Sequence, residues 1–262
     1  MLDTTLNTLW VDGSLGYIEQ VCLTSALNVG HKVRLYTYEE VKNIPDGIEV
    51  QDANKILPKQ HMIQYRKNSS YALGANIFRY ELLRLGKGIW VDADVYFIKP
   101  IQFDCDVLFG WEDSKYINNA ILYFAPNTNI LKQLQSFINS DPVVAPWWSK
   151  EDQEDQKNLY LTGQHKTLES LPWATIGPKA ITYFARLLNL DKFAKPPQVF
   201  YPVHWTEAKR LFDPDFSYTS AIGEDTLAIH IWNHLIEKLK RNAPPAGSFI
   251  YDICKKHNIL ME

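Results

Sequence analysis

Residues 75–95 constrain the fold most strongly, because a helical pattern, a glycine break and an apolar strand follow one another directly. Apolar side chains recur at helical spacing before Gly86, and Gly86 and Gly88 supply the stop signal. The run 88–91 then has the composition of a buried strand, with Asp92-Ala93-Asp94 at its carboxyl end. In open α/β sheets, ligands bind beyond the carboxyl ends of the strands. The pattern therefore predicts an α/β sheet with an acidic ligand site.

The two aspartates of this triplet could share one site. Successive side chains of a strand point to opposite faces, so Asp92 and Asp94 would lie on one side while Ala93 turns away. Two neighbouring carboxylates repel each other unless a cation that favours oxygen ligands, such as Mg²⁺ or Mn²⁺, neutralises them. Such an ion would also stabilise the charge of a departing diphosphate. Acidic triplets are also common in turns and at solvated strand ends, so the triplet alone leaves both interpretations open.

Arg79 lies three residues after Asn76 on the predicted helix, so the two side chains share a face. A lone arginine is commonly a surface residue or one half of a salt bridge. The alternative is a cation that orients the acidic pair or the phosphates of a ligand.

Residues 73–101 resemble the sugar-binding region of GT-A glycosyltransferases that carry an Asp-x-Asp motif. The similar group contains yeast mannosyltransferases, capsule-synthesis transferases and α-1,4-galactosyl- or N-acetylglucosaminyltransferases, so the chain is glycosyltransferase family 32-like. The matching positions are Arg79, Tyr80, Gly88, Ile89, Asp92, Asp94 and Val95. Asn76 stands where the family has an aspartate that helps to hold the nucleotide ribose or base, and Lys87 stands where it has a glycine. Asn76 keeps a hydrogen-bonding amide without the charge.

Other segments extend the resemblance. Trp10 lies near the end of a predicted first strand, where the family has an aromatic residue beside the nucleobase, although a core role is equally open. Asn118 and Asn119 lie where the family places polar residues beside the transferred sugar, or they could simply form a turn. Gly177-Pro178 resembles the start of a family helix, since proline in a first turn loses no needed hydrogen bond.

The run 227–234 alternates like a strand, with His230 and Trp232 on one face. The resemblance implies that a histidine here completes the metal shell or contacts the diphosphate, and that Trp232 contributes to the nucleotide-sugar site. A histidine in an apolar strand can instead be a satisfied core residue. Imidazole suits Mn²⁺ better than Ca²⁺, so ligation by His230 would favour manganese, with Mg²⁺ as the alternative.

The resemblance implies a GT-A type, Rossmann-like α/β fold with a mixed, mostly parallel sheet flanked by helices and added acceptor-side loops. The length of 262 residues suits a single domain. Within it we expect a nucleotide-binding half at 1–100, a sugar and acceptor half at 101–235, and a C-terminal helix or tail at 236–262. Helical spacing predicts a helix over 129–139. The segment 142–166 does not fit the sheet pattern, and we expect it to form a loop or short helices over the acceptor side.

The resemblance implies metal-dependent transfer of a hexose from a UDP-sugar or a related nucleotide sugar. Within the similar family, a galactose-type sugar is the favoured donor. The acceptor would be a hydroxyl of a glycan or lipid-linked oligosaccharide in capsule or lipopolysaccharide synthesis, with retention of configuration. In this hypothesis Asp94 and His230 ligate the metal, Asp92 bonds the ribose or a metal-bound water, and Arg79 orients the pair. Four carboxylates are candidates for the sugar or acceptor side, or are surface charges: Glu112, Asp113, Glu224 and Asp225.

Two rival functions share these features. A sugar-nucleotide hydrolase would use the same metal site with water as the attacking group. A non-catalytic carbohydrate-binding protein could have kept the fold, and the departure at Asn76 leaves that alternative open.

Composition narrows the function and predicts the location. A formal net charge of −3 argues against a general nucleic-acid binder. The three cysteines have no C-x-x-C spacing, which suggests neither a zinc site nor a disulfide framework and favours a reducing compartment. No signal peptide and no apolar run of about 20 residues is apparent, so we expect a cytoplasmic protein. The basic segment 236–256 could contact the anionic inner membrane surface, or form a solvated helix.

Overall fold

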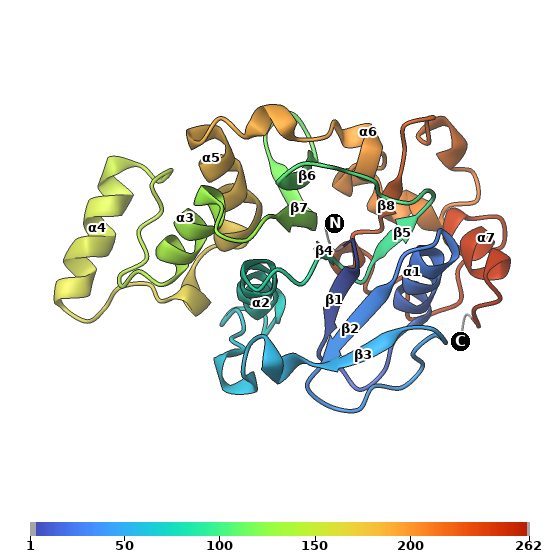
Figure 1. Ribbon diagram of the computed structural model, residues 1–262, viewed down its shortest axis with the longest axis horizontal. Coiled ribbons are helices and arrows are strands. Elements are labelled where there is room, and N and C mark those ends of the chain that lie inside the picture. Colours follow the sequence, from blue (N-terminus) through green and yellow to red (C-terminus); the bar gives the residue numbers. More distant parts are fainter. Residues whose placement is uncertain (1–3, 261–262) are drawn as a thin grey trace.

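The computed structural model describes residues 4–260. Its central sheet has six strands in the order β3-β2-β1-β4-β7-β6 (Figure 1). The strands are β1 (Leu6–Trp10), β2 (Val33–Thr37), β3 (Glu49–Asp52), β4 (Ile89–Val91), β6 (Val107–Trp111) and β7 (Ile117–Phe124). The first four are parallel, and β7 is antiparallel to both β4 and β6. The predicted mixed, mostly parallel sheet is confirmed.

A second, two-stranded sheet lies beside the first. It pairs β5 (Val95–Phe97) with β8 (Ala228–His230) in antiparallel register, so that Val95 lies opposite His230. Only the acidic triplet separates β5 from β4. The chain therefore leaves the main sheet at the triplet.

Helices cover the sheets as the α/β prediction requires. They are α1 (Tyr17–Asn28), α2 (Ala72–Arg84), α3 (Asn129–Ile138), α4 (Lys150–Leu161), α5 (Ala180–Leu187), α6 (Pro197–Phe200) and α7 (Phe249–Lys256). Helix α1 packs on β5 and α7, α2 packs on β4, β7 and α3, and α5 packs on α3 and β7 (Figure 1). Gly86 follows the end of α2 with a φ of 64°, a left-handed conformation that glycine adopts at little cost. The predicted glycine stop is thus present.

Shorter turns connect these elements. Single or double 3₁₀ turns occupy Ala53–Lys55, Lys59–His61, Leu168–Ser170, Asp191–Phe193, Trp205–Phe212, Tyr218–Ser220 and Asn233–Leu235, and a π-type turn occupies Thr175–Lys179. The turn at 175–179 leads directly into α5, close to the helix start expected at Gly177-Pro178.

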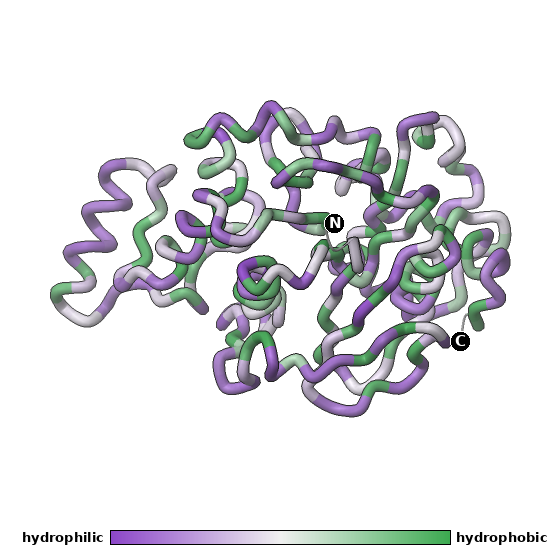
Figure 2. The backbone as a smooth tube through the Cα atoms, in the orientation of Figure 1, coloured by the Kyte–Doolittle hydropathy of each residue, from purple (hydrophilic) through white to green (hydrophobic). Residues whose placement is uncertain are grey.

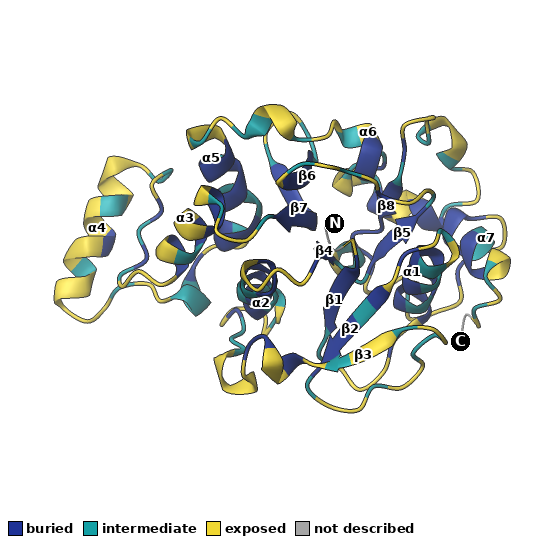
Figure 3. Ribbon diagram, in the orientation of Figure 1, coloured by how far each residue is buried: buried dark blue, intermediate teal, exposed yellow. Residues whose placement is uncertain are grey.

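The segment 142–166 forms a protrusion built around α4. This helix lies at one end of the molecule, and its side chains are largely polar and exposed (Figures 1, 2 and 3). Gln156 is its buried exception, and its side chain exchanges hydrogen bonds with the backbone N–H and carbonyl of Lys166. The amide of Gln156 thereby joins α4 to the segment that follows it.

Between residues 236 and 260, the chain is helical only over α7. Two basic side chains of this segment are engaged within the protein. Lys240 donates to Asn233, and Lys256 Nζ lies 3.5 Å from the hydroxyl of Tyr96. Within residues 4–260, none of the helices combines the length and the apolarity needed to cross a membrane. All three cysteines are free thiols.

Candidate active site

The predicted site residues converge on one edge of the main sheet. Strands β1 and β4 end at this edge, which places Trp10 and Asp92 there. Strand β7 runs the opposite way and begins at the same edge with Asn118 and Asn119. The N–H of Asp92 donates to the carbonyl of Ala120 over 2.7 Å. Residues from three separate parts of the chain thus meet where α/β sheets bind ligands.

The strand geometry predicted for the acidic triplet is wrong. Strand β4 ends at Val91, and the triplet forms a turn in which the N–H of Val95 donates to the carbonyl of Asp92. The turn is required because β5 must leave the main sheet to pair with β8. It nevertheless brings the two carboxylates together, since one ligand atom each of Asp92, Asp94 and His230 lies within 4.8 Å of the others.

Asp94 and His230 form a buried pair. His230 Nε2 lies 3.3 Å from Asp94 Oδ1, and the N–H of Asn233 donates to Asp94 Oδ2 over 2.7 Å. Burial opposes ionisation of Asp94, but the charge and hydrogen bond of His230 and the N–H of Asn233 outweigh it and lower the pKa of Asp94 to about 2. Burial likewise disfavours a charged His230, and Asp94, Asp92 and Glu112 outweigh that penalty and raise its pKa. Both shifts favour the ionised form of this pair when no metal is bound.

This ion pair predicts how stability depends on pH. A histidine whose pKa is raised by folding stabilises fully below its ordinary pKa of 6.5, and that contribution is lost as pH rises through the folded value. We therefore expect the metal-free wild type to lose unfolding free energy relative to His230→Gln above about pH 6.5, by up to about 1.4 kcal/mol per pH unit. Asp94 affects stability at acidic pH instead. Because folding lowers the pKa of Asp94 to about 2, its contribution to the free energy of unfolding is lost as pH falls toward that value.

Urea denaturation in the presence of a chelator, from pH 5 to 9, measures this difference. The exposed His61 provides the matched control, and His61→Gln should follow the wild-type profile. Parallel profiles for wild type and His230→Gln would show that the imidazole gains no proton affinity on folding.

Arg79 holds the other carboxylate. Its Nη2 lies 3.1 Å from Asp92 Oδ1, and the indole N–H of Trp90 donates to the same oxygen over 2.7 Å. Arg79 is buried, donates to the carbonyl of Asn119, and has its guanidinium 4.8 Å from the centroid of the Trp90 ring. It is therefore not a surface arginine, and it makes the contact that an orienting role requires.

Three asparagines line the edge beside the carboxylates. Asn119 donates to the side-chain oxygen of Asn76 over 2.6 Å, and Asn118 donates to Glu112 Oε2 over 2.6 Å. All three are buried, and Asn118 and Asn119 lie within β7, so these two do not form the alternative turn. A Cβ on Gly177 would lie 3.1 Å from the amide nitrogen of Asn119, so the glycine allows the 172–179 loop to approach these amides.

The two tryptophans predicted for the site differ in exposure. Trp10 is partly exposed, and its indole N–H donates to the carbonyl of Ser14 over 3.0 Å. Trp232 is only 4% exposed, donates to the carbonyl of Val203, and lies with its ring 4.1 Å from that of His230. Trp10 is thus open to a ligand, whereas Trp232 packs against the histidine.

The predicted strand alternation of His230 and Trp232 is also wrong. Strand β8 ends at His230, and Trp232 has a left-handed φ of 60°. This conformation is costly for a bulky side chain. It turns the chain so that the N–H of Asn233 reaches Asp94. The turn therefore ends the strand at His230 and gives Asp94 a second partner beside the imidazole.

A buried network behind Asp94 escaped the sequence analysis. Glu19 is 2% exposed and accepts hydrogen bonds from the N–H of Gly16 and from the amide of Asn233. Lys240 donates to Asn233 over 2.7 Å and lies 3.6 Å from Glu19. A glutamate three residues after the N-cap of a helix is a known capping pattern, and this signal could have identified Glu19. Asn233 and Lys240 carry no such local signal.

Among the four candidate carboxylates, Glu112 lies closest to the converging residues. It follows β6, is partly buried and accepts from Asn118, and burial raises its pKa against the effect of that hydrogen bond. Asp113 accepts backbone N–H groups within its own turn. Glu224 and Asp225 are exposed. Asp113 therefore stabilises its own turn, and Glu224 and Asp225 are surface charges.

The group formed by Asp92, Asp94 and His230 fits a divalent metal ion. Octahedral ligands on bonds of about 2.1 Å lie about 3 to 4 Å apart, which agrees with atoms within 4.8 Å of one another. Nδ1 of His230 is buried without a hydrogen-bond partner among the described residues. Carboxylate oxygens with one imidazole nitrogen suit manganese. In the described part of the chain, no other cluster of three such residues has this spacing.

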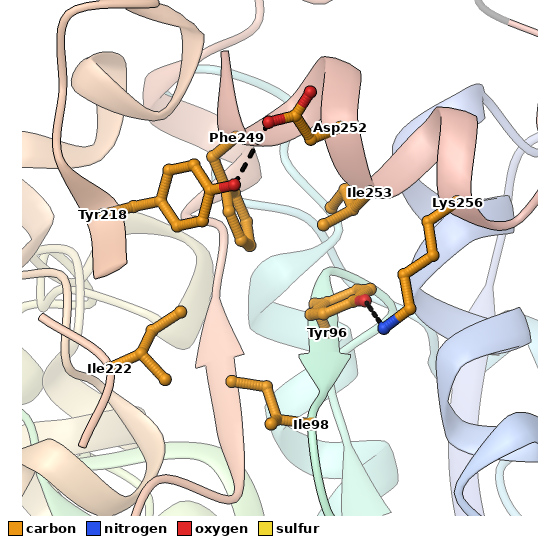
Figure 4. A pocket seen from close by; sticks show the side chains of 8 residues that line it. All are labelled: Tyr96, Ile98, Tyr218, Ile222, Phe249, Asp252, Ile253 and Lys256. Atoms are coloured by element: carbon orange, nitrogen blue, oxygen red, sulfur yellow. Dashed lines mark hydrogen bonds between the residues drawn. The ribbon is translucent and has the colours of Figure 1, made fainter. Parts of the chain in front are cut away.

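A separate surface depression lies between β5 and α7 (Figure 4). Tyr218 there donates to Asp252 over 3.1 Å. None of the residues predicted for the site lines this depression.

Comparisons with known proteins identify the class. Residues 165–257, which include Gly177 and His230, match the family model described as the alpha 1,4-glycosyltransferase conserved region. The chain is a glycosyltransferase, and the predictions of an enzyme of this class are confirmed. Within that class, the match supports a GT-A-like transferase of the α-1,4-galactosyltransferase group.

Two further comparisons complete this result. Similar solved structures include a PaToxG glycosyltransferase, with 13% sequence identity and a TM-score of 0.45, over 73% of this chain and 74% of that chain. No curated protein sequence matches the chain.

Proposed function

We propose that the chain is a metal-dependent hexosyltransferase. It moves a galactose-type sugar from a UDP-linked donor to a hydroxyl of a glycan or lipid-linked acceptor, with retention of configuration. The observation that carries this proposal is the convergence of Asp92, Asp94 and His230 within 4.8 Å at the ligand-binding edge of the sheet. The family match supports sugar transfer.

The residues around this group have complementary roles in the proposal. Asp94 and His230 hold the metal, because Asn233 fixes one oxygen of Asp94 while the other faces the imidazole. Arg79 and Trp90 both bind Oδ1 of Asp92, which orients this carboxylate toward the donor ribose or a metal-bound water. A bound divalent ion would neutralise the diphosphate as it leaves.

The donor extends to both sides of the metal in this proposal. The partly exposed ring of Trp10 stacks on the base, as an aromatic face with a polar edge can do. Asn118 and Asn119 offer amides to the transferred sugar, and Asn76, which accepts from Asn119, offers its amide to the nucleotide ribose or base. Glu112 is the carboxylate on the sugar side, where its oxygens could accept a hydrogen bond from a sugar hydroxyl as they do from Asn118.

A screen of nucleotide sugars for Mn²⁺-dependent release of the nucleoside diphosphate tests this function. Each donor is assayed alone and with a mixture of sugar acceptors, and NMR of the product reports the anomeric configuration. The proposal requires release that depends on Mn²⁺ and increases with an acceptor. Release that is fast without acceptor and unchanged by it would instead identify a sugar-nucleotide hydrolase. No release from any nucleotide sugar would contradict the proposal.

A further inference from the structure

Trp173 is a large aromatic residue held in an exposed position. It is 45% exposed, unlike the buried Trp232. Its ring centroid lies 5.0 Å from that of Tyr65 and 5.8 Å from that of His234, with interplanar angles of 34° and 37°. Two neighbouring rings thus restrain the indole while leaving much of it open to solvent. An apolar surface kept available in this way can receive a ligand.

The two supporting rings connect Trp173 to the candidate active site. His234 directly follows Asn233, whose N–H donates to Asp94. Tyr65 precedes α2, the helix that carries Asn76 and Arg79. Trp173 therefore bridges the turn behind Asp94 and the segment that leads into α2.

The loop that carries Trp173 is fixed against the site. Ala174 adopts a left-handed φ of 66°, which is uncommon for a residue with a side chain and is found at ligand clamps. The next residues are anchored, because Tyr80 donates to the carbonyl of Ile176 over 2.8 Å and Gly177 packs on Asn119. A loop held at these points presents the indole in a defined place.

We infer that Trp173 and His234 form the subsite for the acceptor, and that this acceptor presents a pyranose ring. This inference rests on the proposed function. The apolar C–H face of a pyranose suits the face of an indole, and an imidazole edge can hydrogen-bond a ring hydroxyl. Ligand sites characteristically combine such an aromatic wall with a few polar groups.

The position of the loop favours the acceptor over the donor base. Trp173 is carried by a loop that packs on β7 and α2, whereas Trp10 ends β1. Strands β1 and β7 flank β4 on opposite sides. Through Gly177 the loop of Trp173 thus contacts β7 on one side of β4, whereas Trp10 ends the strand on the other side.

The test compares Trp173→Ala with Tyr160→Ala and Trp173→Phe. Tyr160 is a matched control, because it is 41% exposed and its ring centroid lies 4.9 Å from that of His165, but it belongs to the protruding α4. Acceptor KM is measured with methyl hexopyranosides and lactose, and the Kd of UDP with Mn²⁺ is measured by calorimetry. We expect Trp173→Ala to raise acceptor KM by about tenfold or more and to change the UDP Kd by less than about threefold.

The controls separate stacking from a general loss of structure. Trp173→Phe should recover part of the acceptor affinity, and Tyr160→Ala should match wild type. An unchanged acceptor KM in Trp173→Ala would overturn the inference, as would a tenfold weaker UDP Kd, which would place the ring on the nucleobase. Donor hydrolysis by the wild type without transfer to any of these sugars would overturn the pyranose acceptor but leave the metal-dependent donor site standing. Absence of nucleotide release from every donor would remove the proposed function and this inference together.

Discussion

Replacing Asp94 with alanine should lower kcat/KM for sugar transfer by about a thousandfold, because several kcal/mol of metal stabilisation of the leaving group would be lost. Asp94 is buried, receives the N–H of Asn233 and faces His230, so its carboxylate is held in place between two partners. Steady-state kinetics with the donor found in the screen gives the change. Calorimetry with Mn²⁺ alone should show that the variant has also lost metal affinity.

The exposed Asp106 supplies a control for the general effect of removing a carboxylate. Asp106→Ala should retain wild-type kinetics and Mn²⁺ affinity. Thermal unfolding of both variants shows whether each remains folded. A folded Asp94→Ala variant with most of its activity would refute the assignment of Asp94 as a metal ligand.

Replacing Arg79 with methionine should destabilise the protein by about 2 to 4 kcal/mol, because removing one partner of a buried ion pair leaves the other uncompensated. Arg79 contacts Asp92, the carbonyl of Asn119 and the ring of Trp90, and it has almost no solvent exposure. The partial exposure of Asp92 keeps the expected loss moderate. Urea denaturation in the presence of a chelator measures the change without a contribution from bound metal.

Arg84 on the same helix is a matched control. It pairs with Glu81 on an exposed face, and such pairs contribute less than about 1 kcal/mol. Arg84→Met should therefore leave the free energy of unfolding nearly unchanged. Equal losses for the two variants would mean that Arg79 acts no differently from a surface arginine.

Local patterns were sufficient to predict α2, its end before Gly86 and the buried strand β4. Each of these features depends on residues within one short window, whose spacing and glycines have direct conformational consequences. The resemblance around Asp92 and Asp94 added the class of protein. The convergence of Trp10 and Asp92 at one edge follows from the parallel strands β1 and β4 and was accessible once the sheet was predicted. Asn118 lies there because the antiparallel β7 begins at the same edge.

Features that depend on distant partners were not accessible from these patterns. The pairing of β5 with β8 joins residues 95–97 to residues 228–230, and this pairing is the reason that the acidic triplet forms a turn. The left-handed Trp232 depends on the bond between Asn233 and Asp94, and the buried Glu19 depends on the same turn. Such contacts across more than a hundred residues leave no periodicity in the sequence.

The central claim is that Asp92, Asp94 and His230 hold a divalent ion at the donor site. The most direct test is an anomalous difference map at the manganese absorption edge, from crystals soaked in MnCl₂ and UDP. We predict a peak bonded to a carboxylate oxygen of Asp94 and a nitrogen of His230, with Asp92 beside it. Ordered UDP without a manganese peak at these side chains would contradict the claim.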